Sequence, residues 1–99
     1  MPSSLITPDE WGQQLLLLRR QHQTEWLAYV KTEARSRLAL GAKHLEQQTT
    51  LRQVPFDART AAALIHQQLD ELIEWRDQAA LKRAAIRARH LQAEANPTH

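Results

Sequence analysis

The stretch that decides the fold is VPFD, residues 54–57, because it divides the chain into two long segments. Pro55 disfavours the helical conformation of the residue before it, and Asp57 is a preferred residue for capping the start of a helix. The other three prolines lie near the termini, and the chain has two glycines. The segments on either side of the turn therefore contain few residues that would interrupt a helix.

The start of the first segment is marked by TPDE at residues 7–10. The threonine can cap the free amide groups, the proline suits the first helical position, and the glutamate stands where a capping box requires it. We therefore predict one helix over 8–52 and, after the turn, a second over 58–93. A tail is expected at each end of the chain, over 1–7 and, as a disordered segment, over 94–99.

No segment alternates with period two, so no sheet is expected. The predicted fold class is all-α: a long antiparallel helical hairpin, in which residues 8–93 form a single helical domain with a turn at 53–57. One interior position is ambiguous. Gly41 costs about 1 kcal/mol inside a helix, and a break there would convert the hairpin into a three-helix bundle.

Composition limits the classes of function. The 99 residues are 42% hydrophobic and 24% charged, with a net charge of +2, which indicates a globular protein. The chain has no cysteine, which excludes disulfides, thiolate metal sites and a cysteine nucleophile. The first twenty residues lack the pattern of a secretory signal, and the longest aliphatic run, at 15–18, is too short to span a bilayer. A cytoplasmic protein without membrane association is expected.

The residues that usually carry chemistry are scattered. The histidines at 22, 44, 66 and 90 form no pair with metal-ligand spacing, so no metal and no other cofactor is expected. The sequence contains no glycine-rich phosphate loop and no nucleophile elbow. We predict that the protein is not an enzyme.

The first helix carries two apolar stripes on different faces. At 100° per residue the first falls within an arc of about 80° and comprises Trp11, Leu15, Leu18, His22, Trp26 and Tyr29. The second lies about 130° further around the helix and comprises Leu27, Val30, Ala34, Leu38 and Leu45. Two explanations remain open: a bent helix that wraps one core, or a helix with two interfaces, one of them for a partner.

The second helix carries one apolar stripe that arginines interrupt. The stripe comprises Ala61, Ala62, Ile65, Leu69, Leu72, Ile73, Ala79, Ala80, Ile86 and Leu91. Positions on this side follow heptad spacing from residue 65 to residue 90, and arginine at such positions needs a carboxylate, a phosphate or water. The middle of the helix is acidic and its last third is basic. Two copies packed antiparallel would therefore complement each other, which predicts a homodimer.

These observations favour recognition of a protein partner, as an accessory, adaptor or inhibitor-type regulator of a larger protein. In composition the chain resembles small accessory proteins of bacteria and their phages. The candidate contacts are an aromatic face and a line of arginines: Trp11, Leu15, Leu18, Trp26, Tyr29, Arg76, Arg83 and Arg87.

The alternative is a helical dimer that binds nucleic acid through the basic end of the second helix. Its candidate contacts are Lys82, Arg83, Arg87 and Arg89, together with Arg19 and Arg20. Two observations count against it: acidic residues nearby dilute the positive charge, and residues 76–99 contain no aromatic side chain on which a base could stack.

Overall fold

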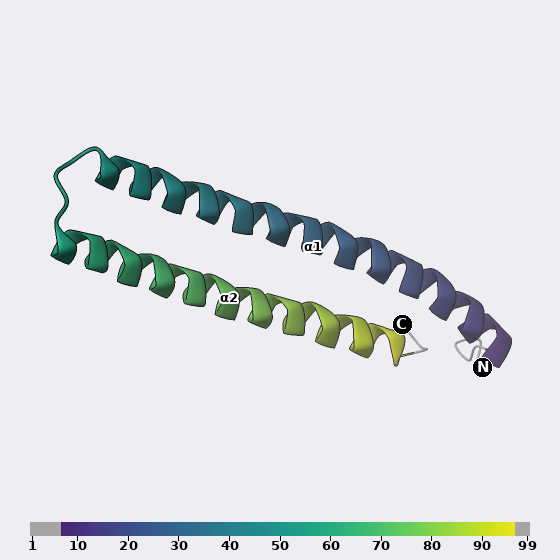
Figure 1. The fold of residues 1–99 in the computed structure, drawn as a ribbon. Helices are drawn as coiled ribbons and strands as arrows, with labels where there is room; N and C mark the ends of the chain where they lie inside the picture. The colour runs from purple at the N-terminus through teal and green to yellow at the C-terminus, as the bar shows by residue number, and fades with distance from the viewer. Residues whose placement is uncertain (1–6, 97–99) are drawn as a thin grey trace. The chain divides into compact units, whose positions relative to one another are not determined.

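The computed structural model describes residues 7–96, which form two α-helices, α1 (Pro8–Arg52) and α2 (Ala58–Glu94) (Figure 1). The described residues contain no strand, and the predicted all-α helical hairpin is confirmed. The predicted alternative, a break at Gly41, is wrong: α1 continues through this glycine, and its φ is not positive. The tail expected at the N-terminus lies, except for Thr7, outside the described residues, as do residues 97–99.

Both helices begin at side-chain caps. Thr7 Oγ1 accepts a hydrogen bond of 3.1 Å from the amide of Glu10, which places one of the unpaired amides of the first turn of α1. At the start of α2, Asp57 Oδ1 accepts a 3.3 Å bond from the amide of Arg59, and its other oxygen accepts the hydroxyl of Thr60 at 2.5 Å. These local signals explain why the helix starts could be read from the sequence.

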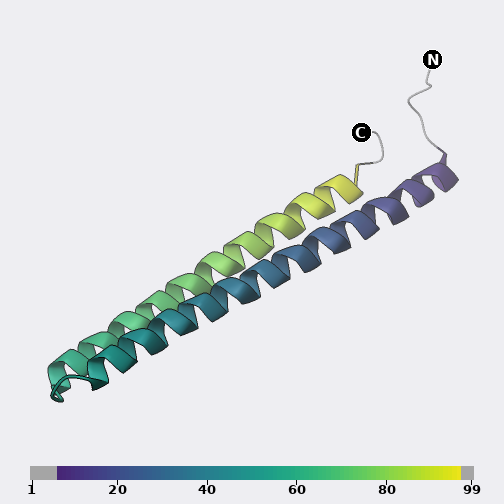
Figure 2. The same ribbon diagram turned by 90° about the horizontal axis from the view of Figure 1, so that it is seen from above.

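Contacts divide the chain into two compact units. Unit 1 contains α1 up to Val30 and α2 from Lys82 onward, and unit 2 contains Lys31–Leu81 with the turn. In each unit a segment of α1 runs antiparallel to a segment of α2 (Figure 2). The single helical domain predicted over 8–93 thus contains two such units.

The helices of each unit meet along a seam that contains many polar side chains. In unit 2 the buried or half-buried residues are spaced mainly three or four apart, as one face of a helix requires, and are Glu33, Leu40, Gly41, His44, Gln47, Gln48, Leu51, Ala61, Leu64, Gln68, Glu71, Leu72, Trp75 and Ala79. Among the described residues of the whole chain, the buried hydrophobic residue is Ala79, whereas Glu33, Gln68 and His90 are buried polar residues. The most buried positions among the described residues are therefore mainly polar.

Candidate interaction surfaces

The seam of unit 2 is organised by an amide cluster around Gln68. Gln48 donates a hydrogen bond of 2.8 Å to Gln68 Oε1. Gln68 Nε2 in turn donates to the backbone carbonyl of His44 at 3.0 Å and to Gln47 Oε1 at 3.1 Å. The Gln68 side chain thus uses both its acceptor and its donor groups, as a buried amide must. This cluster fixes which turn of α2 lies beside which turn of α1.

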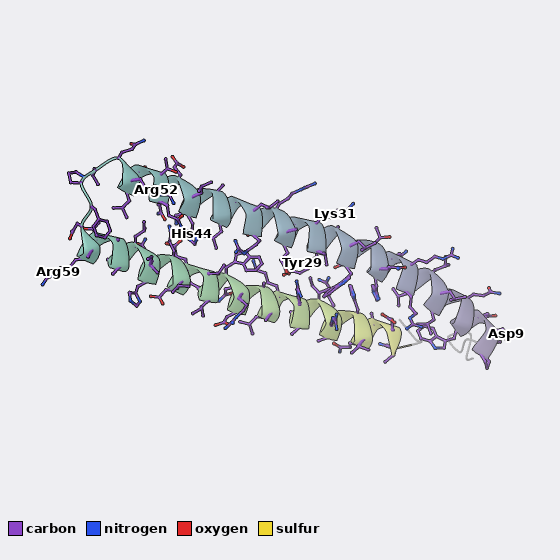
Figure 3. The ribbon with its side chains drawn as sticks, viewed as in Figure 1. Asp9, Tyr29, Lys31, His44, Arg52 and Arg59 are labelled. Carbon is purple, nitrogen blue, oxygen red and sulfur yellow. The ribbon has the colours of Figure 1, made fainter. Side chains whose placement is uncertain are left out.

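A carboxylate continues this seam one turn further along α2. Glu71 accepts hydrogen bonds from Lys43 Nζ at 2.9 Å and Gln67 Nε2 at 3.2 Å, and lies 3.3 Å from His44 Nε2. Figure 3 labels His44, whose side chain lies between α1 and α2. The hydrogen bond from Lys43 and the contact with His44 lower the pKa of Glu71, because both favour the ionised carboxylate.

Unit 1 has two histidines at the same kind of position. The rings of His22 on α1 and His90 on α2 stack with 3.9 Å between their centroids and 4° between their planes. Each ring also meets a glutamate of the other helix: His22 Nδ1 is 2.8 Å from Glu94 Oε2, and His90 Nε2 is 3.2 Å from Glu25 Oε2. Four titratable groups therefore share one level of this seam.

Each glutamate that meets a seam histidine is also paired with a basic residue from the same helix as that histidine. Arg19 lies 3.2 Å from Glu94, and Arg89 pairs with Glu25, in the way that Lys43 binds Glu71 in unit 2. Burial lowers the pKa of His90, and the neighbouring His22 and Arg89 lower it further, while Glu94 raises it. The ring of His90 is therefore held toward its neutral form.

Hydrophobic side chains lie mainly outside the seams. Twelve large hydrophobic residues of the described chain are exposed: Leu16, Leu17, Leu27, Leu38, Leu45, Val54, Phe56, Ile65, Leu69, Ile73, Leu81 and Leu91. Soluble monomers scatter such residues singly, whereas contiguous apolar patches mark interaction sites. The seams combine polar residues with some of the apolar ones, and these twelve apolar residues remain available for other contacts.

Several of the exposed apolar residues each follow a seam residue by one position. Leu45 follows the seam residue His44, and Leu69 follows Gln68. Ile65 and Ile73 likewise each follow a seam leucine. One residue turns a helix by about 100°, so these side chains flank the seam without entering it. In the second apolar stripe predicted on α1, Val30 is half-buried and the other four residues are exposed. Whether a partner covers them stays a prediction.

The N-terminal end of α1 extends beyond the end of α2 within unit 1 (Figures 1 and 2). Glu94, the last residue of α2, contacts Arg19 and His22, so residues 8–17 have no segment of α2 beside them. At 1.5 Å per residue this overhang is about 15 Å long. Near its base lies a hollow of about 210 Å³, lined by Trp11, Gln14, Leu17, Leu18, Gln21 and Asn96.

The residues predicted to contact a partner fall in three places. Trp11 and Leu15 lie on the overhang, and Leu18 lies at its base; all three are half-buried. Trp26 and Tyr29 lie on the seam side of α1, where the Trp26 ring packs against the Tyr29 ring and carries the guanidinium of Arg87, 4.7 Å from its centroid. The structure therefore does not gather the aromatic face and the arginine line into one site.

The other two arginines of that line lie on separate turns of α2. Arg76 is exposed and lies 3.6 Å from Asp77, and Arg83 is exposed on the first turn of α2 within unit 1. Whether either arginine contacts a partner stays a prediction.

The basic residues of the nucleic-acid alternative are partly engaged within unit 1. Arg19 and Arg89 pair with glutamates, and Arg87 stacks on Trp26. The remaining members of the set, Lys82, Arg83 and Arg20, are exposed. Carboxylates that already neutralise basic side chains reduce the gain from phosphate contacts, so this geometry does not favour the alternative.

Two seam contacts could not be found from hydrophobic periodicity. Trp75, which flanks the predicted stripe of α2, donates its indole N–H to Ser36 Oγ at 3.0 Å. Gln68 carried no chemical signal in the sequence, yet it organises unit 2. The available signal was spacing alone, because Gln68 and Trp75 lie seven residues apart and each precedes by one residue a position of the predicted heptad, 69 and 76.

Within residues 7–96, no three His, Asp or Glu side chains are arranged to hold a metal ion. Neither of the described helices is long and apolar enough to cross a membrane. Comparison with known families, characterised proteins and solved structures finds no match to this chain.

Proposed function

We propose that the protein acts by recognising another protein, as a small accessory or regulatory protein without an enzymatic activity of its own. The observation that carries this proposal is the overhang of α1, residues 8–17, where hydrophobic side chains have no second helix beside them. Leu16 and Leu17 are 63% and 60% exposed. An apolar helix end of this kind fits a groove on a partner, as amphipathic helices commonly do.

The run Leu15–Leu18 strengthens the proposal. Four consecutive residues of a helix point in directions about 100° apart and together cover most of its circumference. No rotation of α1 can turn all four leucines toward α2. A helix turn that is apolar all around is normally covered on several sides, and the partner we propose supplies that cover. Trp11 adds the residue type most enriched at the centres of protein interfaces.

The proposal can be tested by photo-crosslinking in the source cells. A benzophenone amino acid at Leu17 should crosslink another protein, because this side chain points outward from the overhang. The matched control is Thr24, which is exposed two turns later on a similar face of α1. A specific product at Leu17, absent at Thr24, is expected. Equal products at both positions, or none at Leu17, would contradict the proposal.

The crosslinked protein should then be purified and its affinity measured. Leu17→Asp should weaken binding by about tenfold or more, since a buried carboxylate loses its hydration. Thr24→Asp should leave the affinity unchanged. Circular dichroism of both variants shows whether helical content is retained, so a loss of binding can be separated from a loss of folding.

A further inference from the structure

Unit 2 carries an apolar face of its own, formed by Leu38 and Leu45 on α1 and by Ile65, Leu69 and Ile73 on α2. These five side chains are between 48% and 73% exposed. From this face we infer that a second copy of the chain packs on unit 2, with α1 of one copy beside α2 of the other. The inference does not depend on the overhang, which belongs to unit 1.

The two halves of the face lie on the same side of the helix pair. Leu45 follows His44 and Leu69 follows Gln68, and the seam bond from Gln68 to the carbonyl of His44 holds these turns side by side. The apolar residue is therefore displaced from the seam by one residue in the same rotational sense on both helices. Because the helices are antiparallel, equal senses of rotation point both side chains to one side of the pair.

Charges at the edges of this face select its occupant. On α2 the outer edge carries the exposed acidic residues Asp70 and Asp77. On α1 the outer edge carries exposed Lys31 and Arg35. A second copy, placed face to face, can match the acidic edge with the basic one, so the complement is already encoded in the chain.

Two arrangements of the second copy are possible, and the charges distinguish them. A two-fold axis parallel to the helices places α1 beside α2 of the partner copy. A perpendicular axis places α2 beside α2 of the partner copy, which brings Asp70 and Asp77 toward the same acidic edge of that copy, and like charges at an interface are unfavourable. The parallel axis is therefore the arrangement we infer, and it brings both turns to the same end.

The levels along the helices also agree with this arrangement. Ser36 accepts the hydrogen bond of Trp75, so Arg35 lies close to the level of Asp77 along the pair. A two-fold axis parallel to the helices preserves levels between copies. Arg35 of one copy then stands near Asp77 of the other. Such rim charges surround an apolar centre, which is the usual anatomy of a protein interface.

The experiment uses the absence of cysteine from the chain. Full-length Arg35→Cys and Asp77→Cys chains are mixed and treated with a short bis-maleimide, and each variant is also treated alone. The parallel axis predicts a crosslinked dimer in the mixture and little product from Asp77→Cys alone. Ala39→Cys with Gln78→Cys is the matched control, since both positions are exposed on the opposite side of the seams from the face and should give no crosslink.

The molecular mass of the protein in solution shows whether two copies of the chain associate. Sedimentation equilibrium of the unmodified chain should give twice the 11.4 kDa mass. Leu69→Lys should weaken the dimer by about tenfold or more, whereas Ala63→Lys, which is exposed outside the face, should not. A monomer at every concentration would overturn the inference, and crosslinking of Asp77→Cys with itself in preference to Arg35→Cys would overturn the arrangement. Neither result would bear on crosslinking at Leu17.

Discussion

The two units close their seams with different chemistry. Unit 1 places two histidine rings against each other between two glutamates, so its seam contains four titratable groups at one level. Unit 2 has a single histidine–glutamate contact, between His44 and Glu71, and beside it a cluster of three glutamine side chains, whose amides carry no charge at any ordinary pH. The comparison shows that polar seams of similar geometry can differ in what disturbs them: protonation in unit 1, and loss of a hydrogen-bonding side chain in unit 2.

The largest effect is expected from removing the centre of the amide cluster. Gln68→Ala leaves Gln47, Gln48 and the carbonyl of His44 without this partner and should lower the free energy of unfolding by about 2 kcal/mol. Urea denaturation followed by circular dichroism measures it. Gln67→Ala, at the exposed neighbouring position, should change the free energy by less than about 0.5 kcal/mol. Equal losses for the two variants would show that the cluster does not organise unit 2.

A second test lowers the pH to distinguish the seam of unit 1 from that of unit 2. Because the folded-state pKa of His90 is lowered, the unfolded chain takes up this proton first as the pH falls below about 6.5. The contribution of neutral His90 to stability is therefore present above that pH and is lost as the pH falls through its folded-state pKa. His22, Glu25, Arg89 and Glu94 are the charged or titratable groups around the ring.

Hydrogen exchange at pH 7.5 and pH 5.5, corrected for intrinsic rates, locates this effect. Backbone amides of unit 1 should lose protection in acid, while those around Gln68 should retain it. His90→Gln should abolish the difference in unit 1. His66→Gln, at an exposed position of α2 in unit 2, is the control and should preserve it. Equal loss of protection in both units would contradict the assignment.

The smallest effect is expected from replacing the two glycines, one in each unit, by alanine. Both lie inside α1 without a positive φ. A methyl group at Gly41 would meet Arg37 Nη1, the end of a flexible side chain, at 3.4 Å, and one at Gly12 would meet nothing within 4 Å. Gly41→Ala should therefore raise the free energy of unfolding by about 0.5–1 kcal/mol.

Gly12→Ala should raise the helical content but change the unfolding free energy less, since the overhang has no packing with α2 to stabilise. Urea titrations of both variants measure the difference. A loss of stability at Gly41 would show that another group packs against this position.

Local signals in the sequence were sufficient for the helices. Thr7 and Asp57 cap the helix starts where their side chains predicted, and Pro55 separates α1 from α2. Only Gly41 was ambiguous, because the cost of one glycine is small against that of disrupting a long helix. Capping and chain breaking depend on neighbouring residues, and neighbouring residues are what a sequence displays directly.

The phase of the seam could not be predicted in the same way. Hydrophobic periodicity placed Ile65, Leu69 and Ile73 in one stripe with Ala61, Leu72 and Ala79. The structure divides that stripe: the first three residues are exposed and the last three lie in the seam. Periodicity did not reveal that Gln68 and His44, rather than the three exposed residues, would meet in the seam. Periodicity reports which residues avoid water, but the molecule that covers them can be the same chain or another one.

The offset of one residue between seam and apolar face means that two helix phases compete when the hairpin folds. Rotating each helix by about 100° about its own axis would bring Leu45 and Leu69 into contact. The resulting hairpin would have an apolar seam and would compete with the observed one. The amide cluster distinguishes the two, since Gln68 can satisfy its donors and acceptor only in the observed phase. Compared with well-packed apolar residues of similar volume, buried polar residues that fix register in this way lower stability and raise specificity. In this chain the three glutamines of the amide cluster favour the helix phase in which the apolar face points outward.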